Sequence, residues 1–181
     1  MSPAREALLR AAREAVRDRP WASVRMVEVA VRAGVSRQTL YNEFGDKRGL
    51  GTAVVEGDLD AFLRGTEQVL ASGTDLARTW EEAARWMVAA AEDNPLIRGA
   101  LTGAWSEPVP LSRTPAALLE ELRRRAVGVL GDRTGVGRPE LDALCDAALR
   151  LTLSYVLIPA PRTGAPLLGA LDGPLREAGR H

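Results

Sequence analysis

The spacing of apolar residues constrains the fold of this chain most strongly. Apolar side chains recur every three or four residues through most of the sequence, as in Leu8, Ala11, Ala12 and Ala15. This spacing is typical of one buried face of an α-helix. We find no clear alternation of apolar and polar residues that would indicate a β-strand. The sequence therefore predicts an all-α fold.

About nine helices are expected from this periodicity and from residues that end or begin helices. Ser2, Ser23, Ser36, Asp46 and Asp75 are each suited to cap the helix that follows. The second helix is expected to bury a stripe formed by Val24, Val27, Ala30 and Val31. The expected helices cover about 3–19, 24–33, 37–44, 47–71, 76–93, 96–105, 115–130, 138–158 and a short segment with leucines from 167 to 175.

Composition excludes several classes of protein. Apolar residues make up 46% of the 181 residues, which is enough for a real core. No apolar run approaches the ~18 residues of a membrane helix, and no apolar signal segment opens the chain, so we expect a cytoplasmic protein. Cys145 is the only cysteine and His181 the only histidine. We therefore expect no disulfide, metal, cofactor or catalytic residue, and no enzyme.

The charge is zero overall but unevenly distributed. Residues 1–50 contain ten basic and six acidic side chains, whereas residues 51–181 contain fourteen basic and eighteen acidic ones. A basic N-terminal part indicates a polyanionic partner at that end of the chain. Ordinary scatter of surface charge is the alternative explanation.

Residues 33–47, AGVSRQTLYNEFGDK, form the most informative segment. Gly34 permits the left-handed backbone of a tight turn between two short helices. Ser36 is suited to cap the second of these and leaves its N-terminal dipole free to attract phosphate. Only Leu40 and Phe44 anchor that helix, so its other side chains face outward. This arrangement indicates a helix-turn-helix, although a polar hairpin on a bundle surface has the same spacing.

The outward side chains have the chemistry of DNA contacts. Arg37 and Gln38 suit guanine and adenine edges in a major groove. Thr39 and Tyr41 have hydroxyls that can donate to phosphate oxygens. Lys47 adds a flexible positive charge at the start of the next helix.

The longer string AGVSRQTLYNEFGDKRGL resembles the recognition region of TetR-family transcriptional regulators. The resemblance covers roughly residues 4 to 52. The matching positions are Ala33, Gly34, Val35, Ser36, Thr39, Leu40, Tyr41, Phe44 and Lys47.

The resemblance implies roles for individual residues on double-stranded DNA. Phosphate contacts are implied for Thr39, Tyr41 and Lys47, and base contacts or a close approach to bases for Arg37, Gln38 and Asn42.

Two residues depart from the family pattern. Arg25 stands where threonine is common, and we expect it to meet phosphate by charge. Glu43 stands where histidine or tyrosine is common, and it could either accept from a cytosine amino group or repel the DNA backbone.

The resemblance also implies the domain organisation and two further partners, a small-molecule ligand and a second copy of the chain. Residues 1–48 would form the helix-turn-helix domain, and residues 49–181 a helical domain for ligand binding and dimerisation. Three segments, YNEFG, Asp93–Leu96 and RLTLSYVLIP, resemble the sequences of actinobacterial family members tied to lipid or alkane metabolism.

Large side chains of the C-terminal part could line a cavity for an apolar or amphipathic small molecule. Trp86 is favoured because it lies off the main apolar stripe of its helix, whereas plain core packing is the better explanation for Met87 and Trp80. Thr102 and Tyr155 would be the polar groups. The full set of candidates is Phe62, Trp86, Met87, Leu101, Thr102, Trp105 and Tyr155.

The helix expected at 138–158 is apolar on more than one face, which suits a homodimer with two-fold symmetry. A central buried helix in a monomer is the alternative. Two-fold protein symmetry would also match the two halves of a palindromic operator. The candidate interface residues are Leu144, Leu151, Leu153, Leu167 and Leu171.

The sequence thus favours a homodimeric repressor that binds a palindromic operator and is released by a small ligand. The alternative is a DNA-binding regulator that has no small ligand and is controlled by a protein partner or acts as an activator.

Overall fold

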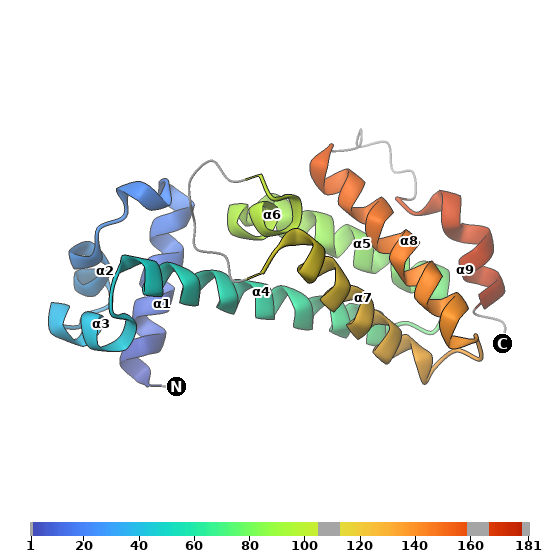
Figure 1. Cartoon of the computed structure of the whole chain (residues 1–181), viewed down its shortest axis with the longest axis horizontal. Helices are drawn as coiled ribbons and strands as arrows, with labels where there is room; N and C mark the ends of the chain where they lie inside the picture. The colour runs from blue at the N-terminus through green and yellow to red at the C-terminus, as the bar shows by residue number, and fades with distance from the viewer. Residues whose placement is uncertain (1, 105–112, 159–166, 179–181) are drawn as a thin grey trace. The chain divides into compact units, whose positions relative to one another are not determined.

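The computed structural model describes residues 2–104, 113–158 and 167–178. Within these residues it contains only helices and the turns between them, which confirms the all-α prediction (Figure 1). The helices of the described part are α1 (Pro3–Asp18), η1 (Trp21–Ser23), α2 (Met26–Arg32), α3 (Arg37–Phe44), α4 (Lys47–Ser72), α5 (Leu76–Asp93), α6 (Pro95–Thr102), α7 (Pro115–Gly131), α8 (Arg138–Leu157), η2 (Gly169–Leu171) and α9 (Asp172–Ala178).

The described residues fall into two compact units. One lies within Met1–Leu59 and includes Ala104, and the other lies within Asp60–Gly103 and Arg113–His181. The continuous helix α4 therefore contributes its first half to one unit and its second half to the other.

In the first unit, α1 packs against α2 and α3. α1 begins as predicted, because the Ser2 hydroxyl accepts a hydrogen bond from the Arg5 amide at 3.1 Å. The core residues of this unit have less than a tenth of their surface exposed. They include Leu8, Ala12, Ala15, Trp21, Val24, Val29, Leu40, Leu50, Val54 and Val55.

The predicted start of the second helix is wrong, and its predicted stripe is buried only at Val24 and Ala30. Arg25 occupies the N-cap position of α2, and the Ser23 hydroxyl instead donates to the Pro20 carbonyl at 2.8 Å. Because the backbone is still extended at Val24, that side chain is buried before the helix begins. The helix then turns its Val29 face inward and leaves Val27 and Val31 with 48% and 73% of their surface exposed.

In the second unit, α5 packs against α6, α8 and α9, and α7 packs against α6 and α8. Core packing is confirmed for Trp80 and Met87 of α5, which are completely buried together with Ala83. α7 ends close to its predicted bounds, and α8 starts where the sequence placed it.

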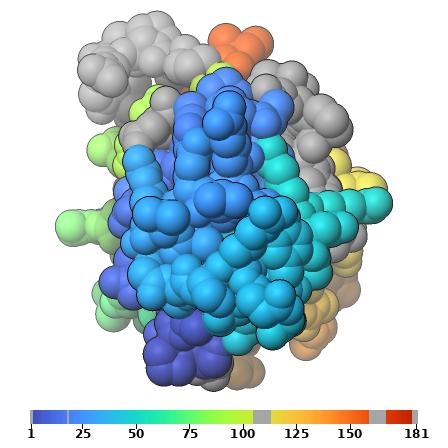
Figure 2. All heavy atoms as spheres, turned by 90° about the vertical axis from the view of Figure 1, so that its left-hand side faces the viewer, coloured from blue at the N-terminus to red at the C-terminus, as the bar shows by residue number. Residues whose placement is uncertain are grey.

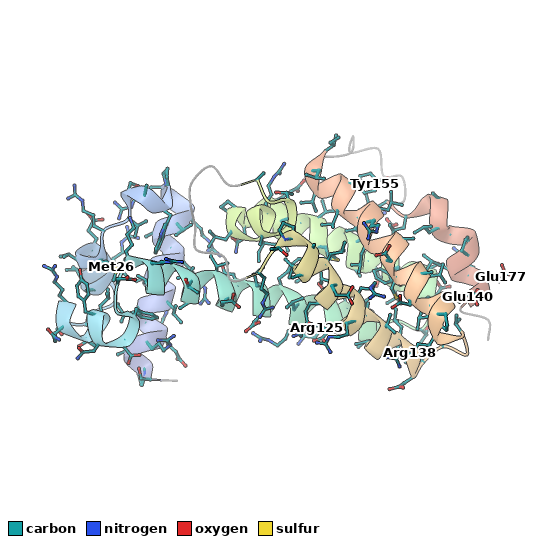
Figure 3. All side chains as sticks on the ribbon, viewed as in Figure 1. Met26, Arg125, Arg138, Glu140, Tyr155 and Glu177 are labelled. Atoms are coloured by element: carbon teal, nitrogen blue, oxygen red, sulfur yellow. The ribbon has the colours of Figure 1, made fainter. Side chains whose placement is uncertain are left out.

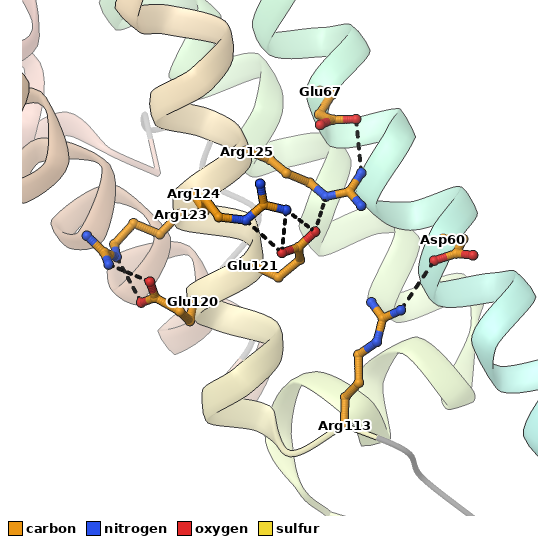
Figure 4. A network of polar contacts seen from close by, with 8 residues as sticks. All are labelled: Asp60, Glu67, Arg113, Glu120, Glu121, Arg123, Arg124 and Arg125. Atoms are coloured by element: carbon orange, nitrogen blue, oxygen red, sulfur yellow. Dashed lines mark hydrogen bonds and ion pairs between the residues drawn. The ribbon is translucent and has the colours of Figure 1, made fainter.

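Ion pairs join α7 and the segment before it to the second half of α4 (Figure 4). The Arg125 guanidinium lies 3.2 Å from the Glu67 carboxylate, and Arg113 lies 3.6 Å from Asp60. Glu121 accepts from both Arg124 and Arg125 on its own helix. Arginine thus serves here as a structural side chain on the surface of the second unit.

The sixth helix is shorter than predicted. It ends at Thr102 because Gly103 adopts a left-handed backbone with φ of 72°. The predicted end at Trp105 lies outside the described residues.

Two aromatic rings lie directly against glycines of α4. A Cβ atom on Gly51 would come within 2.8 Å of the Trp21 ring, and a Cβ on Gly65 within 2.3 Å of the Trp86 ring. These glycines therefore have a packing role that outweighs their low helix propensity.

None of the helices that the structure describes is both long enough and apolar enough to cross a lipid bilayer.

Candidate nucleic-acid interface

The turn between α2 and α3 has the predicted geometry. Gly34 has a left-handed φ of 67°, and the Val35 amide donates to the Ala30 carbonyl at 3.0 Å. The Ser36 hydroxyl caps α3 by accepting from the Thr39 amide at 3.0 Å. α3 then ends at Gly45, which also has a positive φ of 74°. Glycine at both ends fixes a short helix between two sharp turns.

α3 is anchored as the sequence indicated. Leu40 is completely buried, and Phe44 is half-buried with the Arg5 guanidinium 4.4 Å from its ring centroid. Figure 2 looks onto the face of the first unit where the atoms of α2 and α3 lie together, in blue and light blue. Because the anchors occupy one side of α3, the side chains of Arg37, Gln38 and Asn42 are left exposed.

The predicted DNA-contacting side chains of α3 form two pairs along that outer side. Arg37 Nη2 lies 3.4 Å from the Tyr41 hydroxyl, with the guanidinium 5.2 Å from the ring centroid. Gln38 Nε2 donates to Asn42 Oδ1 at 2.9 Å. Each pair joins residues four apart, which face each other on a helix. The structure therefore brings the candidate base-contacting groups together.

Thr39 and Lys47 have local partners as well. The Thr39 and Ser36 hydroxyl oxygens lie 2.8 Å apart. The Lys47 ammonium donates to the Ala22 carbonyl at 2.7 Å and lies 5.4 Å from the Trp21 ring. An ammonium group has three donors, so this contact still permits a phosphate contact. The sequence did not indicate that Lys47 also contacts η1, the short helix that precedes α2.

Arg25 presents a positive charge at the beginning of α2. Its side chain is 81% exposed, and its guanidinium lies 3.9 Å from the Glu28 carboxylate. A hydrogen bond from Arg19, together with the nearby charge of Arg25, lowers the pKa of Glu28 despite some desolvation. Arg25 thus presents an exposed positive charge at the position where the family pattern has the hydroxyl of threonine.

The candidate ligand residues that can be described all lie in the second unit. Phe62 is buried and stacks on the half-buried Trp86, with ring centroids 5.5 Å apart at an interplanar angle of 24°. Leu101 is buried, and the Thr102 hydroxyl donates to the Arg98 carbonyl at 2.8 Å.

The other candidates differ in their surroundings. Met87 is completely buried on α5, and Tyr155 is half-buried on α8, where Figure 3 labels it. Trp105 lies outside the described residues. The contribution of all these residues to ligand binding stays a prediction.

Two residues of α5 have polar groups whose surroundings the sequence did not indicate. The indole N–H of Trp80 is completely buried and has no hydrogen-bond acceptor among the residues that the structure describes. The Glu81 carboxylate accepts from the amides of Leu167 and Leu168, both at 2.9 Å. Burial opposes ionisation of Glu81, but these two amides and Arg85 outweigh it, so its pKa is lowered.

The candidate dimer residues keep part of their surface exposed. α8 buries Leu141, Cys145, Leu149 and Val156 in its own unit. Leu144, Leu151 and Leu153 on the same helix are half-buried, as are Leu167 and Leu171 near α9. Beyond them, Leu157 and Ile158 are 56% and 77% exposed.

Comparisons with known proteins agree with this geometry. Residues 8–54 match the family described as bacterial regulatory proteins, tetR family. The chain is 31% identical over 160 residues to the HTH-type transcriptional regulator AlkX of Mycobacterium tuberculosis, covering 86% of this chain and 75% of that protein. It is 41% identical over 68 residues to the HTH-type transcriptional activator FasR of Mycolicibacterium smegmatis, covering 38% of this chain and 31% of that protein.

A solved structure shows the same fold over nearly the whole chain. The TetR family repressor AlkX from a Dietzia strain, implicated in biodegradation of n-alkanes, aligns with a TM-score of 0.64 at 20% identity over 96% of this chain and 97% of its own. These relatives are transcriptional regulators and not enzymes. An exposed, capped α3 behind a glycine turn, together with the match to AlkX over most of the sequence, shows that this chain belongs to the TetR family of DNA-binding transcriptional regulators.

Proposed function

We propose that this protein is a homodimeric repressor that binds a palindromic operator and is released from it by a small apolar or amphipathic molecule. Residues 1–48 carry the DNA contacts, and residues 49–181 carry the ligand site and the dimer interface. It acts in the cytoplasm, where its operator DNA lies.

The observation that carries the proposal is the outer side of α3. Arg37, Gln38 and Asn42 are exposed there as donors and acceptors for base edges. Around them, Thr39, Tyr41, Lys47 and Arg25 have the hydroxyl or positive groups that phosphates require.

The ligand part of the proposal is supported by the second unit. Phe62 and Trp86 give a stacked aromatic pair. The buried Trp80 N–H would gain an acceptor from the polar end of an amphipathic molecule, whereas a pure alkane would leave it without one. Leaving such a donor unsatisfied costs about 1–3 kcal/mol. Similarity to AlkX, whose Dietzia counterpart is implicated in n-alkane biodegradation, favours an aliphatic compound.

The dimer is supported by the leucines that α8 leaves partly exposed. Leu144, Leu151 and Leu153 are apolar groups on a helix whose other face is already buried. A two-fold axis at this surface would cover the same residues on both subunits. Light scattering should give twice the 19.4 kDa chain mass. A monomer at micromolar concentration would contradict both the dimer and the two half-sites.

The alternative is an activator or a regulator controlled by a protein partner. Its support is the 41% identity to the activator FasR, which is limited to 68 residues. A reporter promoter with operator fragments upstream distinguishes a repressor from an activator. A repressor lowers expression of the reporter, and an activator raises it.

The DNA proposal is tested by selecting operator fragments from random duplexes with the purified protein. We expect a two-fold symmetric site. Lys47→Ala should lower the slope of log affinity against log salt by about 1 per subunit on every duplex. Gln38→Ala should keep the slope, cost roughly 1–3 kcal/mol per contact and relax one position in each half-site.

Arg48→Ala is the matched control, because it removes an exposed positive charge next to Lys47. We expect it to change the salt slope less than Lys47→Ala does. Equal loss on operator and scrambled DNA after Gln38→Ala would show that Gln38 does not contact a base.

The ligand proposal is tested with alkanes, alcohols and fatty acids of increasing length. A binding compound should quench tryptophan emission and weaken operator binding together. Trp86→Ala should alter ligand affinity more than DNA affinity. If no compound has either effect, the regulator without a small ligand is the better explanation.

A further inference from the structure

We propose that Glu43 is a positioning residue, which holds the C-terminal end of α3 against the beginning of α1 and does not contact a base. The proposal rests on the proposed DNA-binding function and adds to it the reason why α3 keeps one orientation.

The first observation is the set of contacts that Glu43 makes. Its carboxylate accepts from the Ser2 hydroxyl at 2.7 Å and lies 3.5 Å from the Arg5 guanidinium. Arg5 also donates to the backbone carbonyl of Glu43 at 3.0 Å. Both side chain and backbone of one residue are therefore tied to the first turn of α1.

The second observation is that these contacts form a closed arrangement. The Ser2 hydroxyl caps α1 through the Arg5 amide while it donates to Glu43. The Arg5 guanidinium also lies over the Phe44 ring, 4.4 Å from its centroid. Phe44 and Leu40 are the apolar anchors of α3, so Arg5 fixes the polar and the apolar side of the same helix end.

The third observation concerns charge. A carboxylate on a DNA-contacting helix would repel phosphates if it were free. The positive charge of Arg5 offsets the negative charge of Glu43, and the side chains of Arg5 and Glu43 are only 32% and 27% exposed. Glu43, which differs from the histidine or tyrosine of the family pattern, is therefore compatible with DNA binding because its negative charge is paired within the protein.

The expected consequence is that Glu43 and Arg5 act through one contact. Tying the end of α3 to α1 limits the tilt of the helix, and small displacements of base-contacting groups such as Gln38 weaken hydrogen bonds steeply. Loss of either partner should therefore lower operator affinity without changing which bases are preferred.

The experiment uses the full-length protein and the operator that it selects. Glu43→Gln and Arg5→Met should each weaken operator binding about fivefold, which corresponds to about 1 kcal/mol. The double variant should be no weaker than the weaker single variant. Affinity for scrambled DNA should not fall after Glu43→Gln, and the preferred sequence should stay the same.

Matched controls separate the contact from the charge. Glu14→Gln and Arg10→Met remove the same charges from exposed positions elsewhere on α1 and should leave operator affinity unchanged. A changed base preference after Glu43→Gln, with Arg5→Met like the unmutated protein, would show that Glu43 contacts a base and would overturn the proposal. Unchanged operator affinity in both variants would overturn it as well.

A second measurement decides the question without DNA. Amide hydrogen exchange should become faster at the start of α1 and the end of α3 in Glu43→Gln and Arg5→Met, and not in the controls. Unchanged exchange would refute the contact. Failure to select any operator would instead count against the proposed function alone.

Discussion

Gly51→Ala is expected to destabilise the protein, although alanine is the better helix former. In an α-helix interior this change normally stabilises by ~1 kcal/mol. Here the new Cβ would lie 2.8 Å from the ring of Trp21, which has only 9% of its surface exposed and cannot move freely. Overpacking of this kind costs ~2 kcal/mol. The net effect is a loss of about 1 kcal/mol in the free energy of unfolding.

Gly57→Ala is the matched control on the same helix. Its Cβ would meet only the Arg13 guanidinium, at 2.4 Å, and that group is the end of a flexible side chain. Moving it puts at risk the Arg13–Asp58 ion pair, which at a partly exposed site is worth ~0.5 kcal/mol. Gly57→Ala should therefore be neutral or slightly stabilising.

A second background tests the cause directly. Trp21→Leu destabilises the chain by itself but removes the ring that meets Gly51. In that background Gly51→Ala should become stabilising by ~1 kcal/mol, because only the helix propensity remains. Urea unfolding followed by helical circular dichroism, at one fixed protein concentration, measures all four variants. If Gly51→Ala is as destabilising in the Trp21→Leu background as in the unmutated protein, contact with the ring is not the reason.

Two further predictions follow from buried or partly buried groups. The pKa of Glu81 is lowered from 4.5, so its contacts stabilise the fold above about pH 4.5 and are lost as pH falls through the lower folded value. Glu81→Gln should thus lower Tm at pH 7, and the difference should shrink below pH 4.5; a constant difference would contradict the assignment. Burial, with Asp142 nearby, raises the pKa of Cys145 to about 12. A thiol reagent at pH 8 should therefore react with it only after unfolding, and rapid labelling of the native protein would disprove its burial.

The sequence by itself determined the order and approximate extent of most helices and the character of the DNA-contacting segment. These depend on local interactions that neighbouring residues carry with them. Ser36 caps α3, Asp75 caps α5, and Gly34 supplies the positive φ of the turn. Leu40 and Phe44 are the two apolar residues of an otherwise polar helix, so the sequence already identifies them as the anchors of α3.

Only the tertiary structure decided contacts between residues distant in the chain. Nothing in the pattern around position 43 shows that Glu43 meets Ser2 and Arg5, 41 and 38 residues away. The inward face of α2 likewise depended on where the extended segment at Val24 ends, which apolar spacing alone does not define. Gly51 has a low helix propensity, and only the packing of the Trp21 ring against it gives glycine a reason to stand at that position of α4. Sequence periodicity reports which residues prefer burial, whereas the packing of helices determines which partners they meet.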